Sequence, residues 1–183
     1  QGAGFYLDAT QAPFSTHYNM RRYILSELTD LVGAALPVDL ERQAIFGHSM
    51  GGHGALTFAL TNPGRFRSVS AFAPIVQPST ADWSRPAFEK YLGPDEAAWR
   101  VYDAVSLIED GRRVDEILVD QGTADQFLDS GLRPWLLADA CLMAGINLSL
   151  HMREGYDHSY NFISTFMADH IAWHAARLAL VAK

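Results

Sequence analysis

Apolar and polar residues follow one another in a pattern that predicts helices separated by short strands. Residues 19–36 carry apolar side chains at three- and four-residue steps, and Pro37 follows them. This spacing predicts an amphipathic helix that ends before the proline, with these apolar positions: Met20, Tyr23, Ile24, Leu28, Leu31, Val32, Ala35 and Leu36. A short apolar strand at 44–46 runs into a glycine-rich turn, and a helix of small residues then extends to Asn62, just before Pro63.

Three further strands and a long helix complete the pattern. Residues 68–73 and 117–119 are short apolar runs typical of buried strands. Residues 146–152 alternate, with Ile146, Leu148, Leu150 and Met152 on one face and Asn147, Ser149 and His151 on the other. The last helix is predicted from about Tyr160 to Leu180, with this inner face: Ile163, Phe166, Met167, Ile171 and Leu178. Strands separated by helices predict an α/β fold with a mostly parallel sheet.

The segment from about 77 to 113 has a different character from the rest. It carries Pro78, Pro86 and Pro94 together with Trp83 and Trp99. So many aromatic residues argue against a linker, and we expect an excursion that packs over one end of the sheet. The length of 183 residues suits a single domain over 1–183 rather than two.

Composition and charge exclude several classes of protein. The chain is 49% hydrophobic and 11% aromatic, which excludes a disordered tail. Its formal charge of −7 speaks against nucleic-acid binding, and it has no run of 18 apolar residues that would span a membrane. The single cysteine, Cys141, permits no internal disulfide and no multi-cysteine metal site, which fits a reducing compartment. The chain begins at Gln1 without a signal pattern, so we do not expect it to start at the native residue.

The strongest chemical signal is the sequence Gly47-His48-Ser49-Met50-Gly51 between a predicted strand and a predicted helix. A nucleophilic serine on such a sharp turn needs glycines on both sides, because neighbouring backbone crowds it. We therefore predict that Ser49 is a nucleophile and that the Met50 N–H stabilises an oxyanion. We expect Gly51, Gly52 and Gly54 to let the helix approach the strand closely. The alternative interpretation is an ordinary glycine-rich turn with a solvated serine.

A serine hydroxyl needs a base, and in this class of fold the order along the chain is serine, acid, histidine. His158 follows the last strand and satisfies that order. His48 is expected to point away from the tip of the turn. His170 and His174 have the i,i+4 spacing of a zinc pair, but Ile171 stands where that motif has glutamate and no third ligand is evident. We therefore expect two histidines on the helix surface and no metal site.

The acid that orients the histidine should follow the third strand. Asp125 lies there and would hold the imidazole through its second nitrogen. Asp120, which ends the strand itself, is the alternative.

With these three side chains in place, the chain resembles the S-formylglutathione hydrolase family, also called esterase D, of the α/β-hydrolase superfamily. The resemblance is most specific in the stretch Gly155-Tyr156-Asp157-His158-Ser159-Tyr160, taken together with the serine turn at 47–51. The matching stretches run from one end of the chain to the other: 2–10, 46–56, 91–93, 102–104, 120–122 with Asp125, 127–128, 155–160, 162–163 and 169–170.

The resemblance implies a cytoplasmic thioesterase that releases formate and glutathione in formaldehyde detoxification. It also implies side activity on simple esters, no cofactor, and in many members a homodimer. It carries over the triad as Ser49, Asp125 and His158. A general carboxylesterase or acyltransferase of the same fold is the first alternative, and a non-catalytic fragment is the second. His17, Tyr18, Trp83 and Trp99 are candidates for lining the approach to the site, and core packing is the alternative for each.

The sequence departs from the family at its beginning. Members of the family have several strands before the stretch that Gln1 matches. Here only one predicted helix precedes the strand at 44–46. The second oxyanion donor comes from a loop on an earlier strand, which these 183 residues do not contain. We therefore expect an N-terminally truncated chain.

Overall fold

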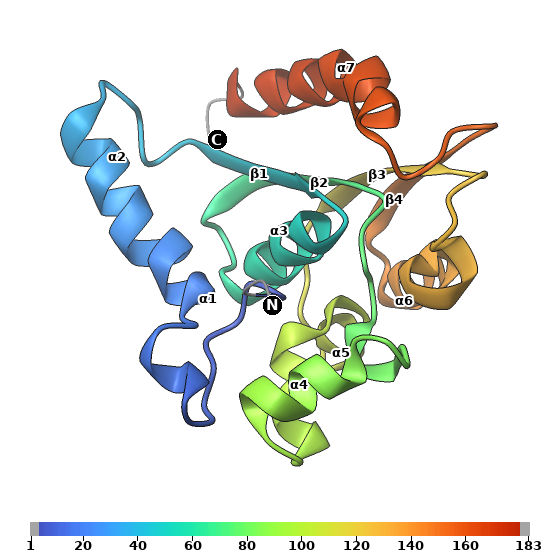
Figure 1. Ribbon diagram of the computed structural model, residues 1–183. Helices are drawn as coiled ribbons and strands as arrows, with labels where there is room; N and C mark the ends of the chain where they lie inside the picture. The colour runs from blue at the N-terminus through green and yellow to red at the C-terminus, as the bar shows by residue number, and fades with distance from the viewer. Residues whose placement is uncertain (1–3, 180–183) are drawn as a thin grey trace.

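The computed structural model describes residues 4–179, and its centre is a parallel sheet of four strands in the order β1-β2-β3-β4 (Figure 1). The strands are β1 (Gln43–His48), β2 (Phe66–Phe72), β3 (Glu116–Gly122) and β4 (Asn147–Arg153), and each pairs in parallel with its neighbour. The predicted parallel sheet is confirmed. Because all four strands run the same way, their carboxyl ends lie at one edge of the sheet.

Helices cover both faces of this sheet, as parallel strands require. The long α7 (Tyr160–Ala179) packs on one face, while α3 (Met50–Thr61) and α6 (Pro134–Ala144) pack on the other, and α5 (Ala104–Glu109) packs against both α3 and α6 (Figure 1). Leu180, the expected end of the last helix, is outside the described residues. The main apolar core lies between the sheet and the three-helix layer, and it contains Leu56, Leu60, Val69, Val119, Leu137 and Cys141.

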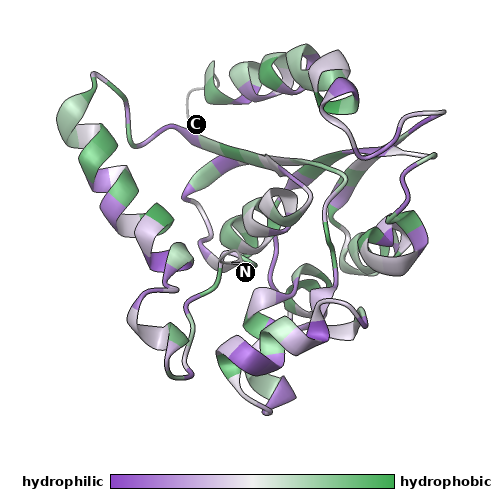
Figure 2. Ribbon diagram, in the orientation of Figure 1, coloured by the Kyte–Doolittle hydropathy of each residue, from purple (hydrophilic) through white to green (hydrophobic). Residues whose placement is uncertain are grey.

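The predicted helix at 19–36 forms in three consecutive pieces. These are α1 (Met20–Arg22), the π-helical η2 (Tyr23–Leu28) and α2 (Thr29–Ala35). The Thr29 hydroxyl donates to the Ile24 carbonyl at 2.9 Å, across the wide π turn. Apolar and polar residues both occur along it (Figure 2), yet none of its residues is buried in the described chain and Leu31 is 63% exposed.

The segment at 77–113 is built from short helices. They are η3 (Pro78–Thr80), α4 (Arg85–Leu92), η4 (Glu96–Tyr102) and then α5. Outside this segment lie the 3-10 helix η1 (Phe14–Thr16) and the π-helix η5 (Leu128–Leu132). Trp99 is buried in a second apolar cluster with Phe88 and Phe5, and its indole N–H donates to the Gly93 carbonyl at 2.9 Å. Trp99 is therefore a packing residue. Tyr18 also packs, against Phe14 and Tyr91, whereas His17 is exposed.

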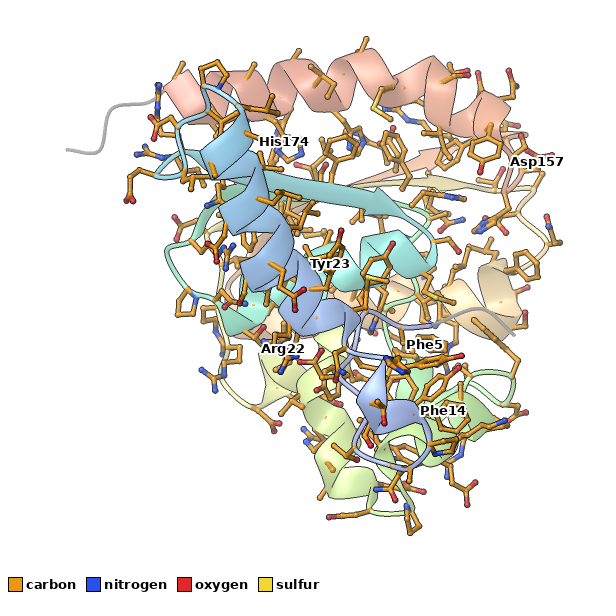
Figure 3. All side chains as sticks on the ribbon, turned by 60° about the vertical axis from the view of Figure 1, so that its left-hand side comes forward. Phe5, Phe14, Arg22, Tyr23, Asp157 and His174 are labelled. Atoms are coloured by element: carbon orange, nitrogen blue, oxygen red, sulfur yellow. The ribbon has the colours of Figure 1, made fainter. Side chains whose placement is uncertain are left out.

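The expectation that His170 and His174 lie on the helix surface is wrong. Both rings are buried between α7 and the sheet, as Figure 3 shows for His174. Two serine hydroxyls on β2 form hydrogen bonds with these rings. Ser70 Oγ bonds His170 Nδ1 at 2.8 Å and His174 Nε2 at 2.7 Å, and Ser68 Oγ bonds His174 Nδ1 at 2.7 Å. Ile171, expected inside, is 49% exposed. Hydrogen bonds to the serines make burial of the imidazoles cheaper than their polarity suggests.

A third buried histidine lies between α3 and the first described segment. The ring of His53 is fully buried, and its Nε2 bonds the Phe5 carbonyl oxygen at 3.1 Å. Burial lowers the pKa of His53 to about 4. At neutral pH the ring is therefore uncharged in the folded protein.

This histidine makes stability fall with acidification. Above pH 6.5 the ring is neutral in both the folded and the unfolded chain. Between pH 6.5 and pH 4 the unfolded chain binds a proton that the folded chain does not, so His53 removes up to about 3 kcal/mol of unfolding free energy over that range. His53→Gln keeps a donor for the Phe5 carbonyl and does not titrate, so we expect a shallower loss of stability in urea unfolding at pH 7 and pH 4.5. The exposed His17→Gln is the control, and equal pH slopes in His53→Gln and the parent would contradict this assignment.

Candidate active site

Ser49 occupies a strained turn between β1 and α3. Its backbone has φ 56° and ψ −116°, a conformation that residues with side chains rarely adopt and that costs on the order of 1–3 kcal/mol. Two backbone hydrogen bonds join the turn to β2 and the residues after it, from Ser49 N–H to the Phe72 carbonyl at 2.9 Å and from Ile75 N–H to the Ser49 carbonyl at 3.3 Å. The His53 N–H in α3 also donates to the Ser49 carbonyl, at 3.0 Å. Such strain persists where the surrounding structure enforces it, and here it puts Ser49 at the carboxyl edge of the sheet.

Close contacts require one glycine of the turn and favour a second. A Cβ on Gly47 would collide with the backbone of Gly51, and a Cβ on Gly52 would lie 3.0 Å from Pro74, which follows β2. The expectation that Gly51 and Gly54 also let the helix approach the strand is wrong. Gly54 faces the ring of Tyr6 instead of the strand, and Gly51 has only ordinary contact with Tyr6. The first described segment therefore packs directly on α3.

The first N–H of α3 belongs to Met50. At the start of a helix this group has no carbonyl acceptor within the helix, and none of the backbone hydrogen bonds of the described residues uses it. It is also at the positive end of the helix dipole. An anionic oxygen formed beside Ser49 would find a donor there.

His158 and Asp125 are joined although 33 residues separate them. His158 Nδ1 lies 2.6 Å from Asp125 Oδ2, in the loops that follow β4 and β3. The Phe127 N–H donates to Asp125 Oδ1 at 2.8 Å, and the Gln121 amide donates to Oδ2 at 3.3 Å. Gln121 and Phe127 lie in stretches that carry the family resemblance, but the sequence does not predict their contacts with Asp125, because such contacts form only between folded loops.

The charge of Asp125 decides which nitrogen of His158 carries the proton. Burial raises the pKa of Asp125, but the hydrogen bonds from His158 and the Phe127 N–H outweigh it, so the pKa lies below its usual value. The carboxylate is therefore ionised at neutral pH and can only accept. It follows that Nδ1 of His158 donates and that Nε2 is free to accept a proton.

Two rings enclose the imidazole of His158. The His48 ring lies with its centroid 4.4 Å from that of His158, and the Phe127 ring lies edge-on at 5.1 Å. Burial, followed by the charge of His158, lowers the pKa of His48 to about 4, so it is neutral and does not repel its neighbour. His48 thus packs on His158, a contact that the sequence did not indicate.

The alternative acid, Asp120, belongs to a different network. It is fully buried and bonds His151 Nδ1 at 2.9 Å and Arg153 Nε at 3.0 Å, while His170 Nε2 lies 3.8 Å away. The attraction of these groups outweighs burial and lowers the pKa of Asp120. Its carboxylate is used by residues of β4 and α7, and His158 is not among its partners in the described chain.

Ser49 lines a cavity of about 740 Å³ beside these residues. This volume is within the range of small-molecule sites, roughly 300–1,000 Å³. Phe127 lines the same cavity and its ring contacts the His158 ring, so the histidine lies next to a wall of this cavity. Trp83 also lines this cavity. His158 bonds Asp125, but in the described residues it makes no hydrogen bond to Ser49 Oγ. The hydrogen bond between a base and its nucleophile is often long or poorly aligned before substrate binds.

Residues 4–179 contain no group of three or more His, Cys, Asp or Glu arranged to hold a metal ion. Among the helices described, none is long and apolar enough to cross a membrane.

A parallel sheet with helices on both faces and a strained serine turn after a strand define an α/β-hydrolase fold. The chain belongs to the esterase family, whose description is "Putative esterase" and which matches residues 1–173.

Particular relatives are also similar over almost the whole chain. S-formylglutathione hydrolase from Paracoccus denitrificans is 54% identical over 178 residues, which cover 97% of this chain and 63% of the relative, and that from Mus musculus is 52% identical over 180 residues, covering 97% and 64%. A solved S-formylglutathione hydrolase from Agrobacterium tumefaciens superposes with a TM-score of 0.95 at 63% identity, covering 96% of this chain and 64% of that one. The chain thus spans a little under two thirds of the length of these relatives.

Proposed function

We propose that the protein is a serine thioesterase that hydrolyses S-formylglutathione to formate and glutathione, with Ser49, His158 and Asp125 as its catalytic residues. The observation that supports this best is the 2.6 Å hydrogen bond between His158 and Asp125 beside the strained turn of Ser49. Relatives named S-formylglutathione hydrolase are 51–54% identical to the chain. The proposal includes a cytoplasmic role in formaldehyde detoxification and a homodimer.

In the first half of the reaction Ser49 Oγ attacks the formyl carbon while His158 Nε2 takes its proton. Asp125 stabilises the imidazolium that forms and keeps the ring oriented. The C–S bond then breaks, His158 gives the proton to the leaving sulfur, and glutathione departs. In the second half His158 Nε2 takes a proton from water as the water oxygen attacks the formyl-serine. The bond between the formyl carbon and Ser49 Oγ then breaks, His158 returns the proton to Oγ, and formate is released.

The Met50 N–H is the proposed oxyanion donor from this chain. A single donor of this kind contributes about 3–4 kcal/mol to the stability of the transition state. A second donor from a loop on an earlier strand is part of the proposal.

Substrate comparison tests the proposal. The full-length protein should hydrolyse S-formylglutathione with a kcat/KM far above that for p-nitrophenyl acetate. The reverse order would favour a general carboxylesterase or acyltransferase. Mass spectrometry after treatment with an alkyl fluorophosphonate should find the adduct on Ser49. A protein that is unlabelled and inactive on both substrates would favour the non-catalytic alternative.

A further inference from the structure

The cavity beside Ser49 lies between two segments that come from different parts of the chain. One wall contains Thr80 and Trp83, from the 77–113 segment. The other contains residues that follow β3: Phe127, Asp129, Ser130, Leu132 and Arg133. The Trp83 indole lies against Gly131, where any Cβ would collide with it. Arg133 joins the walls, because its Nη2 donates to the Gln77 carbonyl at 2.7 Å and to the Thr80 hydroxyl at 2.8 Å.

Arg133 has donors to spare. Its guanidinium carries five N–H groups in a planar fork. The hydrogen bonds of the described residues use only Nη2, and Nε is buried without a partner. An arginine that lines a cavity with unused donors is suited to a carboxylate, which can accept two parallel hydrogen bonds.

The lining also carries charge of the other sign. Asp82 and Asp129 face the same cavity as Arg133, and both are exposed. A wall with an arginine and two aspartates does not suit a purely apolar acyl chain or a simple anion. It suits a molecule that carries carboxylates and an ammonium group together.

We propose that this cavity binds the glutathione part of the thioester, with Arg133 binding a carboxylate and Asp129 binding the γ-glutamyl ammonium. The inference rests on the proposed function, since the formyl carbon must lie at Ser49 while the peptide extends along the cavity. Glutathione has two carboxylates and one ammonium group, which match the mixed charge of the lining. Trp83 and Phe127 line the cavity and are both more than 40% exposed, so a bound peptide could extend toward solvent beside them.

The decisive measurement combines a variant with a modified substrate. Steady-state kinetics of the full-length protein are compared for S-formylglutathione and its diethyl ester, whose carboxylates are blocked. In the parent we expect esterification to raise KM at least tenfold. In Arg133→Met we expect KM for S-formylglutathione to rise about tenfold or more, and the further effect of esterification to disappear. Arg133→Lys should recover part of the discrimination, because it keeps the charge and loses the fork.

Arg112→Met is the matched control, since Arg112 is exposed and outside the cavity lining, and it should discriminate as the parent does. Because Arg133 also joins the walls, Asp129→Asn provides an independent test at an exposed position. It should raise KM for S-formylglutathione severalfold and have no such effect on the N-acetyl derivative, which has no ammonium group.

Equal losses on the charged and blocked substrates in both variants would overturn the inference. A parent that does not hydrolyse S-formylglutathione at all would instead overturn the proposed function, so the two failures are distinguishable.

Discussion

Replacing Ser49 with alanine is expected to lower kcat for thioester hydrolysis by about 10⁴-fold or more, because no other group in the site forms the acyl-enzyme. The backbone at position 49 has a positive φ in either case, so the substitution adds no new strain. The measurement is pre-steady-state kinetics with S-formylglutathione, in which the burst of glutathione release should disappear while thermal unfolding stays unchanged.

Ser164→Ala is the matched control. Ser164 is exposed on α7, and its hydroxyl makes only a local hydrogen bond to the Asn161 carbonyl. It should retain the parent's kinetics. Retained turnover in Ser49→Ala would remove Ser49 as the nucleophile, and with it the proposed mechanism.

The second large effect separates the two candidate acids. Asp125→Asn replaces a carboxylate that accepts from His158 Nδ1 with an amide that can donate to it. The ring then favours a proton on Nε2, the atom that must accept from Ser49, and kcat should fall on the order of 10³- to 10⁴-fold. Asp120→Asn leaves this bond intact and should keep turnover while lowering the denaturation midpoint, because Arg153 and His151 lose a buried ionised partner.

The two substitutions therefore have opposite signatures. Activity and stability should separate cleanly in kinetic and urea-unfolding measurements on both variants at neutral pH. A collapse of kcat in Asp120→Asn with a stable fold, or normal kcat in Asp125→Asn, would reassign the acid.

Local pattern was enough to predict most of the secondary structure. Short apolar runs predicted β1, β2 and β3 within a few residues, and the alternation of apolar and polar residues over 146–152 predicted β4. The turn at 47–51 could be predicted for the same kind of reason, since backbone crowding at Gly47 is a property of the turn itself. The order of strands along the chain also indicated which loops meet at the carboxyl edge.

The faces of the last helix could not be predicted from its own sequence. Polarity alone predicts His170 and His174 outside and Ile171 inside, whereas the two histidines are buried and Ile171 is exposed. Ser68 and Ser70, a hundred residues away on β2, decide the outcome by bonding the imidazoles. The spacing of apolar residues along a helix does not indicate hydrogen-bond partners that lie on a distant strand.

The sequence by itself determined the parallel α/β sheet, the serine turn and the loops in which an acid and a histidine follow their strands, because each depends on residues close together in the chain. Only the tertiary structure decided that Asp125, and not Asp120, bonds His158, that His48 packs on that ring, and that Arg133 faces the cavity beside Ser49. These relations arise where separate loops pack against one another. Their distances depend on the whole fold.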